Sequence, residues 1–282
     1  MRRALVGTAL LILLPDLAAA WPAETMTALG RDARRLLPRS LSRLLGERET
    51  KIQLELQKFP PALGQALAQD IPAGELRPET LAALEYEADR AVEMLREGQV
   101  SQGLVRMGAL LRIPADLSDP VLSGVPEGWP PGVTREYYAL LAAHFDRMPV
   151  VLDEPKALEV GRAELPRLWQ SLLARSRPQA TVIHRELFKS GRLVDHRRLD
   201  YRSPAWAVAS LSYSRAVTGI AATWLAVWRE AQGDLTKRGR AREVVPRDRE
   251  PGAVATTPER GDAPAAAHPS VADEHPEHPE AQ

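Results

Sequence analysis

Apolar side chains recur along most of the chain with the spacing of amphipathic helices. Three stripes stand out, over residues 81–95, 100–111 and 206–227. Side chains three or four residues apart lie on one face of a helix, so each stripe predicts a helix that buries that face. The two-residue alternation of half-buried strands is almost missing, and no hairpin signal stands out.

The ends of these segments carry residues that favour helix boundaries. Pro78 and Gly98 flank the first stripe, while Pro204 and Gly233 flank the longest one, an arrangement typical of helix starts and ends. We therefore expect an all-α protein in which residues 21–236 form a single compact multi-helix domain. Weaker helical patterns and two proline-rich loops complete it: helices at about 24–46, 49–58, 133–147, 156–175 and 179–189, and loops at 59–61 and 120–131.

The first twenty residues have the features of a secretory signal peptide. Arg2 and Arg3 supply the positive start, and the apolar run over 4–14 has eleven residues, whereas a bilayer span needs roughly 20. Alanines at 18–20 provide the small side chains that signal peptidase reads. We expect cleavage before Trp21, export to the periplasm or the medium, and no transmembrane span in the mature chain. An uncleaved membrane anchor is the alternative.

The C-terminal segment 237–282 has a composition that does not favour folding. It contains seven prolines, no aromatic residue and no Leu, Ile or Met. Such a segment buries too little apolar surface to offset its loss of conformational entropy, so we expect a disordered tail. Its histidines, His268, His275 and His278, form a weak metal-binding pattern, and a solvated tail is the stronger interpretation.

Composition narrows the function classes further. The 37 basic and 37 acidic side chains give a formal net charge of zero, which does not indicate a nucleic-acid-binding protein. The chain has no cysteine, which excludes disulfides, thiolate catalysis and iron–sulfur clusters. Six histidines are a small supply for a metalloenzyme, and half of them lie in the tail.

One segment carries a specific motif. Residues 108–124 read GALLRIPADLSDPVLSG, which resembles the central motif G-x-x-x-H-x-x-x-D-L-x-x-P-L-H-x-G of the zinc-dependent phospholipase C and single-strand nuclease superfamily. Residues 210–217 and 224–228 look like the closing helix of its bacterial members. The resemblance implies an all-α, exported phosphodiester hydrolase with three zinc ions. It also implies a mature chain whose N-terminal Trp binds zinc through its amine and carbonyl.

Two of the metal-ligand positions that the resemblance implies carry a matching residue in this chain. Trp21 follows the expected cleavage site, and Asp116 matches the aspartate of the motif. Where the family has histidines, the chain has Met26, Arg112 and Leu122. A guanidinium stays protonated and does not bind zinc, and neither Met nor Leu replaces an imidazole. We expect Arg112 to form an i,i+4 ion pair with Asp116 in place of a metal's charge.

The histidines of the expected domain are too few for the family's metal cluster. Residues 21–236 contain three: His144, His184 and His196. The family's later histidine–carboxylate pair should fall within 133–148, where His144 lacks an acid four residues further on. His144 and His196 stay as weaker candidates for a reduced metal site. The expected cofactor is zinc, with fewer ions than the family holds or none.

These observations leave three functional hypotheses. The favoured one is an exported, catalytically degenerate family member that acts as a binding or structural protein, and for it the resemblance implies a phospholipid or another phosphate-containing ligand. The second is an active metal-dependent phosphoric ester hydrolase with a reduced metal site that uses Trp21, Asp116 and further ligands. The third is an unrelated helical exported protein. A general base at His196, assisted by Asp195, is a minor alternative to a structural loop there.

Overall fold

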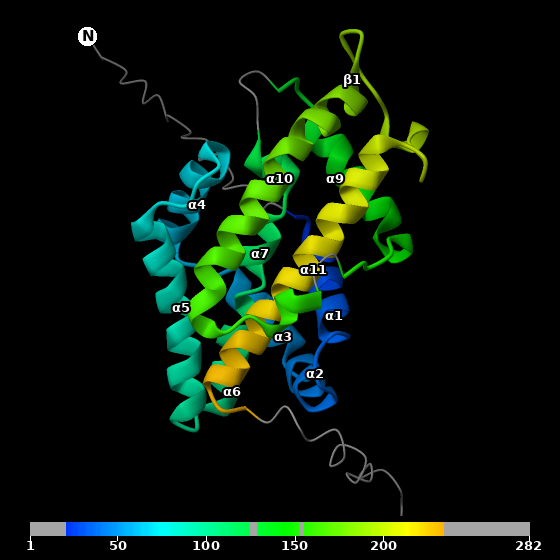
Figure 1. Cartoon of the computed structure of the whole chain (residues 1–282). Helices are drawn as coiled ribbons and strands as arrows, with labels where there is room; N and C mark the ends of the chain where they lie inside the picture. Colours follow the sequence, from blue (N-terminus) through cyan, green and yellow to red (C-terminus); the bar gives the residue numbers. More distant parts are fainter. Residues whose placement is uncertain (1–20, 125–128, 153–154, 234–282) are drawn as a thin grey trace, which may run out of the picture. The chain divides into compact units, whose positions relative to one another are not determined.

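The computed structural model describes residues 21–124, 129–152 and 155–233, and most of these residues are helical (Figure 1). All of them belong to one compact unit. The expected all-α class is therefore confirmed. The helices are α1 (Ala23–Arg34), α2 (Arg39–Gly46), α3 (Glu49–Leu56), α4 (Pro61–Ala73), α5 (Pro78–Arg96), α6 (Val100–Ala109), α7 (Arg112–Leu117), α8 (Pro120–Ser123), α9 (Val133–His144), α10 (Leu165–Leu187) and α11 (Pro204–Glu230). Short 3₁₀ helices and two strands join them: η1 (Phe145–Arg147), η2 (Pro155–Glu159), η3 (Arg162–Glu164), β1 (Phe188–Lys189), β2 (Arg192–Leu193) and η4 (His196–Arg198).

Helix α11 is the centre around which other helices pack. α10 lies alongside it, and α1, α5, α7 and α9 also contact it (Figure 1). Every residue from Ala216 to Val227 is buried, as a helix enclosed by others requires. Gly219 lets α11 pack closely against α10 and α7, because a Cβ there would lie 2.8 Å from Leu172 Cδ1 and 3.0 Å from Pro114 Cβ. The glycine thus brings α7, which carries the sequence motif, against the core.

Helix α10 differs from the pattern-based expectation. It runs without a break through Pro178, although the pattern predicts two helices, at 156–175 and 179–189. The proline removes one backbone hydrogen bond. The apolar face continues beyond it with the buried side chains of Ala180 and Ile183, and this packing keeps the helix intact.

Several short elements lie where the pattern predicts none. α4 and α8 occupy segments that carry loop signals or no assignment, and β1 and β2 form an antiparallel hairpin in which Lys189 pairs with Arg192. Ser190 and Gly191, between the strands, have φ values of 51° and 75°. Positive φ at both positions is the requirement of the tightest hairpin turns. Strands of two residues are too short for alternation to reveal them.

Two expectations concern residues outside the described part of the chain. The signal peptide over 1–20 and the disordered tail over 237–282 both stay predictions. Among the described helices, none combines the length and the apolar character needed to cross a membrane.

Candidate functional site

The motif segment 108–124 is packed tightly at both of its end glycines. A Cβ at Gly108 would overlap the side chain of Ile52 in α3. At Gly124 a Cβ would lie 2.6 Å from Ala180 Cβ and 2.7 Å from the carbonyl oxygen of Arg177, both in α10. The backbone contact leaves no room for a side chain. Close packing against two helices therefore explains both glycines of the motif.

Trp21 lies against this motif. Its side chain is buried, and its Nε1 donates a hydrogen bond of 2.9 Å to the carbonyl oxygen of Ala115 in α7. Ala115 precedes Asp116, so the two positions that the resemblance assigns to metal ligands meet at one helix. Met26, where the resemblance implies a histidine, is buried in the apolar core and packs as a hydrophobic residue.

Arg112 and Asp116 form the expected ion pair along α7. Arg112 Nε lies 3.2 Å from Asp116 Oδ2, and Arg112 Cζ lies over the Phe59 ring, 4.5 Å from its centroid. Burial raises the pKa of Asp116 to about 6, and the neighbouring Arg112 opposes that rise. A single ion pair thus only partly compensates for the loss of hydration at this carboxylate.

A cavity of about 150 Å³ lies beside this pair. Arg112, Asp116 and Leu122 line it together with five residues of α4: Gly64, Leu67, Ala68, Ile71 and Pro72. Three positions that the resemblance assigns to metal ligands therefore face one cavity. Their chemistry does not fit a zinc centre, because Asp116 is the one metal-ligating side chain among the residues that line it.

Asp119 is a second buried carboxylate, just beyond Asp116. Its Oδ1 accepts a hydrogen bond from Val121 N and its Oδ2 accepts one from Tyr138 OH, both at 2.8 Å. Burial raises its pKa to about 7 despite these two bonds, and the charge of Asp116 adds to the rise. Asp119 before Pro120, the first residue of α8, is a recognisable capping signal. Nothing in the sequence indicates that the carboxylate is fully buried.

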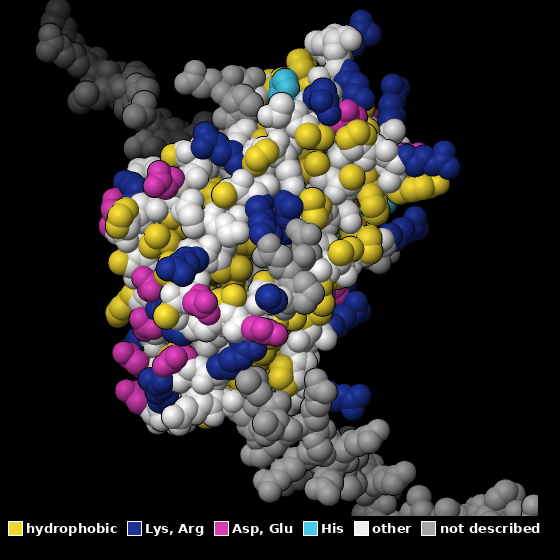
Figure 2. Space-filling view, in the orientation of Figure 1, with side chains coloured by type: hydrophobic (Ala, Val, Ile, Leu, Met, Phe, Trp, Pro, Cys, Tyr) yellow, Lys and Arg dark blue, Asp and Glu magenta, His cyan; other side chains and the backbone are white. Residues whose placement is uncertain are grey.

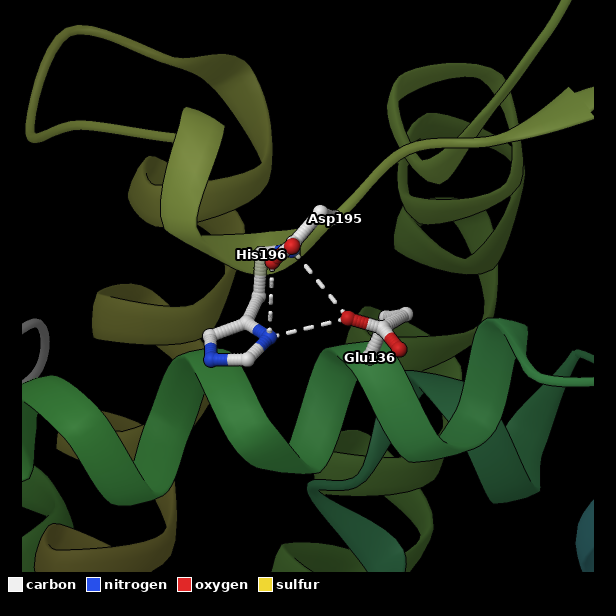
Figure 3. Close-up of side chains that lie close together, drawn as sticks. All are labelled: Glu136, Asp195 and His196. Carbon is white, nitrogen blue, oxygen red and sulfur yellow. Dashed lines mark hydrogen bonds and ion pairs between the residues drawn. The ribbon is translucent and has the colours of Figure 1, made fainter.

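Glu136, Asp195 and His196 form a separate polar group (Figure 3). Glu136 Oε2 accepts hydrogen bonds from the backbone N of His196 at 3.1 Å and lies 2.8 Å from its Nδ1. Asp195 Oδ1 is 3.4 Å from the same Nδ1 and also accepts a bond from Arg197 N. The second ring nitrogen, Nε2, points away from both carboxylates (Figure 3). These contacts attach the η4 loop to α9.

The pKa of Glu136 shifts in the opposite direction to the pKa of Asp116. Hydrogen bonds from the side chain and backbone of His196 lower the pKa of Glu136 to about 2, and Arg135 contributes further. Figure 2 shows basic side chains around this hairpin end of the described unit. Exposed basic residues near it in the sequence are Lys189, Arg192, Arg197, Arg198 and Arg202.

The two weaker metal candidates do not come together as one group. Within the described residues, the close set of potential ligands that contains His196 consists of Glu136 and Asp195 besides it, without His144. His144 lies half-buried at the end of α9. Sequence reasoning missed Glu136, although it falls within 133–148, where the family's acidic ligand was expected. Its partner is 60 residues away, and no local spacing could indicate that pairing.

The chain was compared with protein-family models, with curated proteins and with solved structures, and nothing matched in any of the three comparisons.

Proposed function

We propose that this protein is an exported, non-catalytic relative of the zinc-dependent phospholipase C and nuclease superfamily that acts by binding. In this proposal an arginine–aspartate pair stands where the family holds zinc. The cavity lined by Arg112, Asp116 and Leu122 carries the proposal, because three positions aligned by the resemblance share one wall. The contact of Trp21 with α7 supports the same alignment.

The donor set explains why hydrolysis is not expected at this cavity. Phosphodiester hydrolysis in the family depends on metal ions that polarise the phosphoryl group and activate water. Arg112 cannot ligate a metal, Leu122 is apolar, and Asp116 already accepts from Arg112. The side chains at this site can bind and orient a small polar group. They do not offer a general base, because the Asp116 carboxylate is already paired with Arg112.

Restoring the two histidines tests the alignment directly. The double variant Arg112→His and Leu122→His should bind about one zinc ion per chain, using Asp116 and the free amine of Trp21. The matched control, Arg112→Gln with Leu122→Asn, changes the same positions without imidazoles and should bind none. Both proteins must be exported with the native signal peptide, and intact mass should show the chain starting at Trp21. Zinc is measured by elemental analysis after dialysis.

Three outcomes would count against the proposal. Stoichiometric zinc in the wild-type protein, together with phosphodiester hydrolysis, would replace it with an active enzyme. A folded double variant without zinc would remove the support from the family alignment. An intact mass that retains residues 1–20 would exclude the expected processing.

A second candidate is a phosphoric ester hydrolase that keeps a single metal ion at Glu136, Asp195 and His196. One ligand atom from each residue lies within 4.8 Å of the others. However, a zinc ion bonded to both Nδ1 and Oε2 would hold these atoms about 3 Å or more apart, and they now lie at 2.8 Å, a hydrogen-bond distance. Metal-dependent phosphodiesterase activity that is lost in His196→Ala and kept in Asp116→Asn would establish this candidate.

A further inference from the structure

The cavity beside Arg112 has the size and wall of a small-ligand site. Its volume is about 150 Å³, and a cavity of that size accommodates a molecule such as benzene. The side chains of Leu67, Ala68, Ile71 and Leu122 make most of its wall apolar. An apolar wall with a few polar groups at one end is the usual composition of ligand pockets.

The charged end of this cavity has unused hydrogen-bond donors. The Nε atom of Arg112 donates to Asp116, and its Cζ atom lies over the Phe59 ring. Within the described part of the chain, neither Nη atom of Arg112 has a hydrogen-bond partner in the protein. Two free guanidinium nitrogens match the two oxygens of a carboxylate, which forms a bidentate pair with this group. The cation–π contact with Phe59 helps to hold the guanidinium in place for such a contact.

Charge selects among the anions that could use these donors. Asp116 contacts the same guanidinium and lines the same cavity. A dianionic phosphate would place two negative charges beside the Asp116 carboxylate, whereas a monoanion adds one charge to a nearly neutral ion pair. The apolar wall then favours a ligand with a short hydrocarbon portion.

We propose that this cavity binds short-chain monocarboxylates, with the carboxylate on the two Nη atoms of Arg112 and the alkyl chain against α4. The inference rests on the proposed binding function and deepens it, because a zinc centre at the same residues would occupy this space. It assigns a ligand class that differs from the phosphodiesters implied by the resemblance.

Titration of the full processed chain with hexanoate tests the proposal. Two-dimensional NMR or calorimetry should show saturable one-site binding, and hexanol, which lacks the carboxylate, should bind at least about tenfold more weakly. Arg112→Gln should weaken hexanoate binding by a similar factor. Ala68→Trp, at an exposed cavity-lining position of α4, should abolish binding by filling the space. The matched control Ala62→Trp lies on the same helix, is exposed, is not part of the cavity lining, and should bind normally.

Each of the other outcomes would reject one part of the proposal: the ligand class, its place in the protein or the proposed function. No saturable binding of hexanoate to zinc-free protein rejects the ligand class while leaving the proposed loss of the metal centre intact. Unchanged binding in Ala68→Trp places the ligand elsewhere. Tighter binding of butyl phosphate or inorganic phosphate than of hexanoate replaces the carboxylate with a phosphate ligand. Stoichiometric zinc in the wild-type chain rejects the proposed function itself, since zinc content is measured independently of hexanoate binding.

Discussion

Asp116 and Glu136 are two carboxylates paired with nitrogen groups, and their pKa values move in opposite directions. Asp116 is buried with a single ion pair to Arg112, and its pKa rises to about 6. Glu136 has two hydrogen bonds from His196 and a contact from Arg135, and its pKa falls to about 2. At Asp116, the loss of hydration on burial raises the pKa more than its single partner lowers it. At Glu136, the several hydrogen bonds lower the pKa more than burial raises it.

The difference separates the tasks of the two regions. The pair at Arg112 leaves guanidinium donors free beside a cavity, which is an arrangement suited to binding. The group at Glu136 uses its acceptors internally to attach η4 to α9, which is an arrangement suited to holding a loop. The proposed ligand site therefore lies at the buried carboxylate that has a single charged partner.

The largest effect is expected from Arg112→Ala. Removing the guanidinium leaves a lone buried carboxylate, so we expect a loss of about 3 kcal/mol in the free energy of unfolding at pH 8. The loss should be smaller at pH 5, below the pKa of Asp116, where the carboxyl is protonated. Urea denaturation measures both values. The double variant Arg112→Ala and Asp116→Ala should recover most of the loss, and unchanged stability of Arg112→Ala at pH 8 would contradict the ion-pair interpretation.

Asp119→Asn should stabilise the protein at high pH. Because the folded pKa of about 7 exceeds the unfolded value near 3.8, the unfolded chain loses its proton first as pH rises. The contribution of Asp119 to stability is then full below about pH 4, is lost between about pH 4 and 7, and stays low above that. Asparagine removes this titration and keeps an acceptor for Val121 N. We expect a gain of about 2 kcal/mol at pH 8 and none at pH 4, measured by denaturation at both. An equal effect at both pH values would argue against a buried titrating carboxyl.

Glu136→Gln should have a smaller effect with the opposite pH dependence. The folded pKa of Glu136, about 2, lies below its ordinary value of 4.5. Its contribution is therefore present above about pH 4.5 and is lost as the pH falls toward 2. The glutamine still accepts from His196 N, so we expect a loss of about 1 kcal/mol at pH 6 that shrinks toward pH 3. Acid denaturation curves of both proteins measure the difference, which should decrease below pH 4.5 and be largely lost near pH 2.

Asp195→Asn should change least. The side chain of Asp195 is about half exposed and its ion pair with His196 is long, at 3.4 Å. The amide oxygen can still cap Arg197 N, so the change in unfolding free energy should stay within about 0.5 kcal/mol. A much larger loss would show that Asp195, rather than Glu136, holds the η4 loop.

Local sequence patterns predicted the long helices and the contacts between residues on the same helix. The long apolar stripes locate α5, α6 and α11, and the Arg112–Asp116 pair follows from a spacing of four residues on one helix. The contact between Glu136 and His196 joins residues 60 positions apart and has no sequence signal.

The cavity was beyond prediction for a different reason. Its apolar wall comes from α4, a helix with proline at its start and near its end and without a clear stripe. Its charged end depends on the free nitrogens of Arg112, and these become visible only when every neighbour has been placed. The depth of burial that shifts the pKa of Asp119 is likewise a property of packing between α8 and α9, joined by Tyr138.

The buried indole of Trp21 would link the proposed cleavage of the chain to its folding. Signal peptidase needs an extended, accessible backbone, and the expected cleavage site lies directly before a side chain that is enclosed and bonded to Ala115. Under the proposed processing, cleavage would come before this residue docks. In that proposal, proteolysis would set the time at which the Trp21 indole covers α7 and bonds to Ala115.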